Sequence, residues 1–190
     1  MAIVLASQSP RRQELLARIG VEDFKTLSLD IDESYPEGLS PEDTVRYIAK
    51  KKCDAAAALC APDDLIITAD TMVFLDNDRL GKPRDEEDAL RMLRALSGRG
   101  HTVCTGVSVR RGAQEERFAV STRVFFRPMT DDEIRAYIKP GEPMDKAGAY
   151  GVQSRGALFV ERIDGDFFNV MGLPVEQLGL VLARFGVKLL

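Results

Sequence analysis

The sequence contains no tryptophan, one histidine and three cysteines. The cysteines are odd in number and lack the spacing of metal ligands, so they predict neither a disulfide framework nor a zinc site. Cys53 and Cys60 lie in an alanine-rich stretch, which favours small core residues of a helix. The single histidine, His101, has no evident partners for a Ser/His/Asp triad, and we interpret it as a residue at a strand edge.

Long apolar runs and basic blocks are also missing. No run approaches the roughly 20 residues of a membrane span, and nothing resembles a signal peptide, so we expect a cytoplasmic protein that does not enter membranes. The net charge of -4, without a long basic block, argues against nucleic acid as a partner. At 190 residues, of which 45% are hydrophobic, the chain is long enough for one sizeable core, and we expect one domain over residues 1–190.

The usual nucleotide signatures are absent too. The sequence has no GxxxxGK[ST] loop and no GxGxxG after a strand. This argues against P-loop ATPases, protein kinases and dinucleotide-binding enzymes.

The chain begins with a pattern that favours anion binding. An apolar run over residues 3–5 predicts a buried strand, and Ser9 and Pro10 suit the N-cap and first position of a following helix. Arg11 and Arg12 then fall in the first helical turn. Free backbone N–H groups, hydroxyls and guanidinium groups together predict a site for phosphate. The alternative is an ordinary strand–helix junction whose arginines face water.

The rest of the chain predicts an α/β fold, a mixed sheet with flanking helices. Capping and proline signals predict helices that begin near Ser40, Asp85, Thr130 and Pro174. Apolar runs and alternation predict strands over residues 65–67, 103–109 and 118–126, and a hairpin of residues 158–160 and 167–170 that turns at 164–165.

Charged and polar residues gather where the predicted strands end, which is where ligands of α/β sheets bind. They are Ser7, Arg12, Asp32, Glu33, Asp70, Thr71, Lys82, Asp145, Lys146 and Gln153. Each also has a plainer explanation: Asp70 as a turn cap, Lys82 as a solvated loop residue, residues 32–33 as an exposed acidic loop. Together, carboxylates for a divalent cation and basic groups for phosphate suffice for metal-assisted hydrolysis of a phosphoanhydride.

Six blocks of this sequence resemble the Maf family, in the family's order. They are residues 5–16, 69–71, 81–83, 96–101, 145–153 and 170–174. The resemblance implies a nucleoside triphosphate pyrophosphatase that uses Mg²⁺ or Mn²⁺ and removes non-canonical nucleotides. It also implies a fold similar to inosine triphosphate pyrophosphatases, with two lobes around a nucleotide cleft, and it allows a homodimer.

The resemblance also implies roles for individual residues. The double arginine, Thr71 and Gln153 match the branch that acts on dTTP and UTP rather than on 7-methyl-GTP. Asp70 would be the proton acceptor, Arg12, Thr71 and Gln153 would set specificity, and Glu33 and Asp70 would hold the metal. Around the phosphates the resemblance places Ser7, Lys52, Lys82 and Lys146.

Two other functions remain open at this stage. One is a phosphatase that releases orthophosphate from small esters. The other is a nucleotide-binding regulator of cell division with little turnover, because the family takes its name from a septum-formation phenotype.

Overall fold

The computed structural model describes residues 2–190, and the chain divides into two compact units. Unit 1 comprises residues 2–70, 105–120 and 172–190. Unit 2 comprises Thr71–Cys104 and Ser121–Met171. Within residues 2–190, no helix is long and apolar enough to cross a membrane.

A seven-stranded mixed sheet has the order β2-β1-β3-β5-β6-β7, with β4 as a further partner of β3. The strands are β1 Ile3–Leu5, β2 Phe24–Thr26, β3 Leu65–Leu75, β4 Asp78–Leu80, β5 Gly100–Arg111, β6 Gln114–Phe126 and β7 Val160–Asp164. β1 is parallel to β2 and β3, whereas β4 is antiparallel to β3 and β7 to β6. The predicted α/β class with a mixed sheet is confirmed.

Helices begin where capping signals predicted them. They are α1 Pro10–Arg18, α2 Pro41–Ala57, α3 Glu86–Leu96, α4 Asp131–Ile138, α5 Phe167–Met171 and α6 Val175–Arg184, with 3-10 turns η1 Glu142–Asp145, η2 Ala147–Ala149 and η3 Arg155–Phe159. Ser40 and Asp85 each accept a hydrogen bond from the backbone N–H three residues on, and Thr130 forms the reciprocal box with Glu133. These bonds satisfy donors that a helix start otherwise leaves unpaired.

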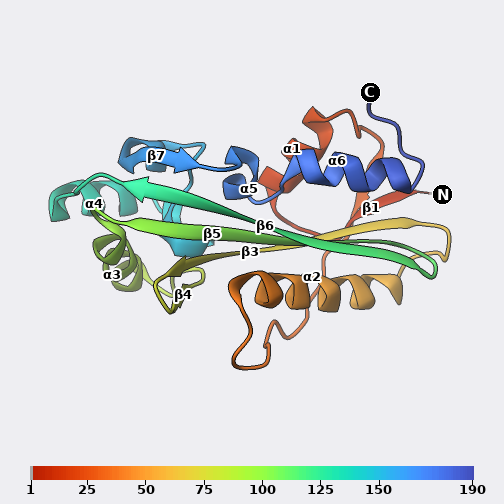
Figure 1. Ribbon diagram of the computed structural model, residues 1–190. Helices are drawn as coiled ribbons and strands as arrows, with labels where there is room; N and C mark the ends of the chain where they lie inside the picture. The colour runs from red at the N-terminus through yellow and green to blue at the C-terminus, as the bar shows by residue number, and fades with distance from the viewer. Residues whose placement is uncertain (1) are drawn as a thin grey trace. The chain divides into compact units, whose positions relative to one another are not determined.

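In unit 1, α2 covers one face of the strands, and α1 and α6 lie on the opposite face (Figure 1). Gly106 on β5 lets α2 approach closely, because a Cβ atom there would lie 2.3 Å from the carbonyl carbon of Val45. The Thr68 hydroxyl on β3 donates a 2.7 Å hydrogen bond to the Ala49 carbonyl of α2. This helix is therefore fixed against both β3 and β5.

The predicted hairpin at residues 158–170 is wrong in both arms. Residues 155–159 form the turn η3, and the strand is β7, which pairs with β6 rather than with the segment that follows. That segment is α5: the Asp166 side chain accepts a 2.7 Å bond from the Phe168 N–H, and the Asp166 carbonyl accepts from Val170. An apolar run this short is compatible with strand or helix, so local hydrogen bonding decides.

Two single-residue predictions also need correction. His101 is not at a strand edge: it is 2% exposed on β5, between β3 and β6 in the sheet order. Cys60 lies beyond the end of α2 and is half-buried, packed against Ile66 and its neighbours, whereas Cys53 is fully buried in α2 as predicted.

Candidate active site

Lys52 joins two carboxylates in unit 1. Its Nζ lies 2.7 Å from Asp70 Oδ1 and 2.8 Å from Glu33 Oε1. The Lys52 and Asp70 side chains are 14% and 9% exposed, while that of Glu33 is 56% exposed. Alternation along β3 places Thr68 and Asp70 on the face that α2 covers, which explains why this lysine of α2 reaches the carboxylate.

The second oxygen of Asp70 has no such partner. Asp70 Oδ2 is buried and, among residues 2–190, accepts no hydrogen bond. Leaving a buried acceptor unpaired costs about 1–3 kcal/mol, so such atoms are rare unless they serve a ligand or a reaction. Lys52 thus holds Asp70 by Oδ1, and Oδ2 remains available to accept a hydrogen bond or bind a ligand.

Arg12 is tied to the backbone beside the first strand. Its Nε donates to the Gly172 carbonyl at 2.8 Å and its Nη1 donates to Ser7 Oγ at 3.3 Å. Burial lowers the pKa of Arg12 below its ordinary value, and the negative charges of Asp70 and Glu33 oppose this shift. The guanidinium therefore stays charged, in the field of both carboxylates.

The start of α1 has Ser9 and Pro10 at the predicted positions. Ser9 is the N-cap and has extended backbone, but its side chain makes no capping bond. Instead its N–H donates to Ser7 Oγ at 3.2 Å. The side chain of Ser9 therefore does not cap the first turn, which begins with Pro10.

The four charged side chains of this group carry equal numbers of positive and negative charges, and Arg11 adds a positive charge nearby. The carboxylates of Glu33 and Asp70 carry two negative charges, and Lys52 and Arg12 carry two positive charges. A triphosphate, which carries several negative charges, would therefore need further cations in order to bind strongly. Basic side chains elsewhere or a divalent metal ion could supply them.

The donor set fits a metal ion shared with a substrate. No cluster of three or more His, Cys, Asp or Glu side chains able to hold a metal exists in the part of the chain that the structure describes. Glu33 and the unpaired Asp70 oxygen nevertheless offer two carboxylates. Mg²⁺ commonly takes one or two carboxylates together with substrate phosphate oxygens, so these residues suit that arrangement.

The other predicted site residues belong to unit 2. The Gly148 N–H donates to the Gly81 carbonyl at 3.0 Å, which joins the segment around Lys82 to the segment that holds Lys146 and Gln153. Lys82 is exposed, and no ion pair involves it within residues 2–190. The Lys146 amine instead donates to the Glu142 carbonyl at 2.6 Å and to Asp145 at 2.8 Å.

Two further positions complete the set in unit 2. Gln153 is exposed, in a turn after the buried residues Gly151 and Val152. Thr71 follows Asp70 directly on β3, so strand alternation turns its side chain to the opposite face. Ser154, the next residue, adopts φ −129°, which any residue tolerates.

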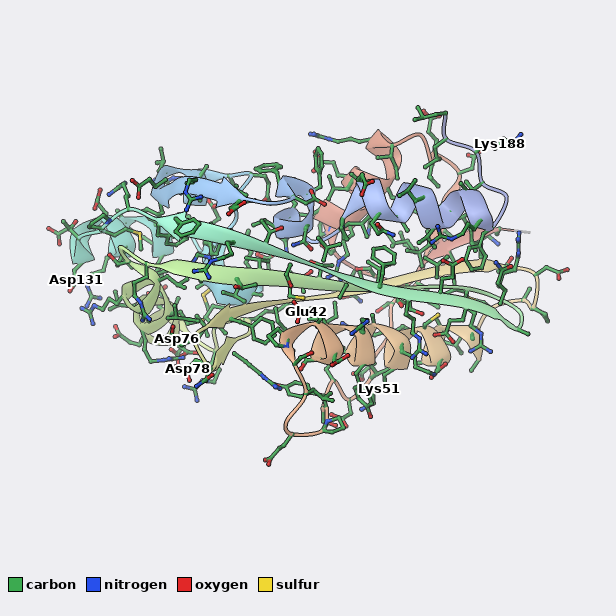
Figure 2. All side chains as sticks on the ribbon, viewed as in Figure 1. Glu42, Lys51, Asp76, Asp78, Asp131 and Lys188 are labelled. Atoms are coloured by element: carbon green, nitrogen blue, oxygen red, sulfur yellow. The ribbon has the colours of Figure 1, made fainter. Side chains whose placement is uncertain are left out.

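The structure thus brings five of the predicted residues together in unit 1: Ser7, Arg12, Glu33, Lys52 and Asp70. That they share a pocket with Lys82, Lys146 and Gln153 stays a prediction. Asp32 is outside the group. It is exposed and ion-pairs with Lys51 of α2 at 3.2 Å, and hydrogen bonds from Ser34 lower its pKa to about 2. Figure 2 labels Lys51 on α2.

One contributor was missed from the sequence. Gly172 fixes Arg12 through its backbone carbonyl, and it adopts φ +119°, a conformation that favours glycine. A backbone acceptor leaves no mark on residue type. The only signal was a glycine inside the last resembling block, residues 170–174.

Known proteins are similar to this chain over nearly its whole length. The family model described as Maf-like protein matches residues 2–185. A protein of Bacillus velezensis named dTTP/UTP pyrophosphatase is 47% identical over 186 residues, which cover 98% of this chain and 97% of that protein. A Dictyoglomus turgidum protein of the same name is 47% identical over 191 residues, covering 99% of this chain and 98% of its own.

A solved structure supports the fold independently. The structure of a HAM1 protein from Coxiella burnetii matches with a TM-score of 0.58, at 15% sequence identity, over 97% of this chain and 99% of that chain. At this identity the likeness shows the fold alone, and it is the fold that the resemblance implied. With the family model matched over nearly all residues and relatives at 47% identity, the chain belongs to the Maf family.

Proposed function

We propose that this protein is a nucleoside triphosphate pyrophosphatase that hydrolyses dTTP and UTP to the monophosphate and pyrophosphate. The observation that carries the proposal is Asp70, whose Oδ1 is held by Lys52 while its buried Oδ2 is unpaired. The names of the Bacillus velezensis and Dictyoglomus turgidum relatives supply the substrate. We further propose that the protein works in the cytoplasm, where it removes unwanted nucleotides.

In the proposed reaction Asp70 is the general base. Its Oδ2 accepts a proton from a water molecule, and the water oxygen forms a bond to the α-phosphorus. The bond from the α-phosphorus to the oxygen that bridges to the β-phosphorus breaks, and pyrophosphate leaves. Lys52 keeps Asp70 in one orientation, and a positioned base of this kind typically contributes about 10²–10⁴-fold.

Positive charge would hold the triphosphate. Arg12 would contribute its positive charge and, by exchanging its bond to Ser7, a fork of N–H groups that matches phosphate oxygens, while the start of α1 adds the positive end of its helix dipole. Lys82 and Lys146 are proposed as further phosphate ligands. Lys146 must exchange its bonds to Glu142 and Asp145 for this, whereas Lys82 has no ion pair to break within the described residues.

A divalent cation, Mg²⁺ or Mn²⁺, is proposed as the cofactor, with Glu33 and Asp70 as its protein ligands. When bound, such an ion neutralises phosphate oxygens and makes a coordinated water more acidic. The two carboxylates support the proposal, because a triphosphate brings several negative charges that Glu33 and Asp70 would repel unless a cation lay between them.

Base choice is proposed to rest on Gln153 and Thr71. Thymine and uracil present two carbonyl acceptors on either side of an N–H donor, and a glutamine amide supplies both acceptor and donors. Cytosine would leave part of this pairing unmet, and an unpaired buried group costs about 1–3 kcal/mol.

A panel of triphosphates with both phosphate products quantified tests the proposal. We expect pyrophosphate and monophosphate from dTTP and UTP, with metal present, and no release after a chelator is added. Exposed Asp54 on α2 gives a matched control, Asp54→Asn, which should behave as wild type beside Asp70→Asn. Orthophosphate as the sole product would contradict the proposal, and so would nucleotide-induced stabilisation without hydrolysis.

A further inference from the structure

A buried aromatic group in unit 2 lies under the segment that ends at Gln153. His101 Nε2 and the Tyr150 hydroxyl are 2.8 Å apart, and these two side chains belong to residues 2% and 6% exposed. Phe126 packs edge-on to both rings, with centroids 4.9 Å from His101 and 4.7 Å from Tyr150. The hydrogen bond therefore lies in apolar surroundings, where it is stronger than in water.

The segment itself is held at several points before it reaches the surface. Gly148 adopts φ +69° and packs so closely on Val73 that a Cβ atom would lie 2.7 Å from a Val73 methyl group. The Gly151 N–H donates to the Tyr137 hydroxyl at 3.1 Å. Tyr150 is extended and anchored through His101, and Gln153 follows three residues later at the exposed end.

Stability alone does not explain a histidine at position 101. Its Nδ1 is buried and, within residues 2–190, has no hydrogen-bond partner, which costs about 1–3 kcal/mol. Burial also lowers the pKa of His101 to about 3, so the ring is neutral near pH 7 and does not act as an acid or base there. A phenylalanine would fill the same aromatic surroundings without an unpaired nitrogen, but it could not bond to Tyr150.

We propose that His101 is a positioning residue for Gln153: its hydrogen bond to Tyr150 fixes the backbone of residues 150–153 and so sharpens the choice of base. The inference rests on the proposed function, because it takes Gln153 as the residue that reads the base. It adds that part of the specificity originates on β5, in a side chain that touches no substrate.

The test combines His101→Phe with two readouts. The first is amide hydrogen exchange over residues 150–153, which we expect to become faster in the variant. The second is the ratio of kcat/KM for UTP and CTP, which we expect to fall about three- to tenfold, the range that loss of one neutral hydrogen bond allows. The melting temperature at pH 7 should change little, because the variant removes the unpaired Nδ1 but leaves the Tyr150 hydroxyl without its partner.

Three variants separate positioning from general damage. Tyr150→Phe should reproduce both effects, and the double variant should add little, because both changes remove the same bond. His101→Gln, whose amide end can reach the same hydroxyl, should restore part of the base preference. Val103→Ala, a buried truncation on the same strand, should lower the melting temperature without changing the UTP/CTP ratio.

The outcomes are distinguishable from those of the proposed function. If wild-type protein fails to release pyrophosphate, the proposed function is wrong. If it is active but His101→Phe leaves the exchange of residues 150–153 unchanged, the inference is overturned. An equal loss of preference in Val103→Ala would also overturn it, since destabilisation alone would then explain the effect.

Discussion

The two units place predicted site residues by different physical means. In unit 1, Lys52, Asp70 and Glu33 are locked by ion pairs, and Arg12 is bonded to a backbone carbonyl and a hydroxyl. In unit 2, the segment that leads to Gln153 is held by buried tyrosines, a histidine and close glycine contacts. The charged residues of unit 1 thus lie on β3, on α1 and α2 and on the irregular segment that holds Glu33, whereas Gln153, which we propose reads the base, lies on a supported turn.

The comparison predicts two kinds of defect. Changes in the unit 1 group should slow or weaken hydrolysis of every triphosphate alike, because all share the same phosphates. Changes under or at Gln153 should alter the ranking of bases more than the rate.

Asp70→Asn should have the largest effect. Removing the general base is expected to lower kcat by about 10²–10⁴-fold, while the protein stays folded because the amide is the same size. Pyrophosphate release and a melting curve check this. Near wild-type turnover would take Asp70 out of the mechanism and break the distinction between the units.

Arg12→Ala should come next. Loss of charge-assisted bonds to phosphate is worth about 1.5–3 kcal/mol, so KM should rise about 10- to 100-fold for all triphosphates. Arg12→Lys should restore little, because an ammonium cannot reproduce the fork. Exposed Arg18→Ala is the control on the same helix. A wild-type KM in Arg12→Ala would refute the role.

Gln153→Ala should blur base choice. We expect the preference for UTP over CTP to fall about tenfold, within the 1–3 kcal/mol of an unmet polar group, with a smaller change in kcat for UTP. Relative rates across a nucleotide panel measure this. Unchanged ranking with a large drop in rate would place Gln153 in the chemistry instead.

The last prediction concerns stability in acid rather than activity. His101 has a folded pKa of about 3, below its ordinary value, so between about pH 6.5 and 3 the unfolded chain binds more protons than the folded one. Stability should therefore fall as pH falls through this window, and His101→Phe should flatten part of that slope. Melting temperatures of both proteins across the window provide the check. Parallel curves would contradict a buried neutral histidine.

Local signals explain how much of the fold could be predicted. Ser40, Asp85 and Thr130 act through bonds three residues away, so their sequence pattern is sufficient. The segment Phe167–Met171 could not be assigned from its short apolar run, since strand and helix use the same residues there. His101 could not be placed because its partner, Tyr150, is 49 residues away.

For the candidate site, the sequence indicated which residues take part but not how their side chains are arranged. The sequence identified Lys52, Asp70 and Glu33, but the ion pairs among them depend on how α2 packs on β3. The hydrogen bond from Arg12 to the Gly172 carbonyl could not be predicted for a different reason, because every residue has a carbonyl and residue type does not mark the one that is used. Motifs can thus reveal the chemistry, whereas tertiary contacts determine which oxygen of Asp70 is left unpaired.

The missing side chain at Gly106 has a consequence for Lys52. A Cβ atom at position 106 would meet the backbone of Val45, which precedes Lys52 on α2 by two helical turns, about 10 Å at 1.5 Å per residue. A single methyl group at position 106 would push α2 away from the sheet. Lys52 would move with the helix, and its amine holds Asp70. Gly106→Ala would therefore disturb the ion pair between Lys52 and Asp70 although every charged residue is unchanged and position 106 is not proposed to contact the nucleotide.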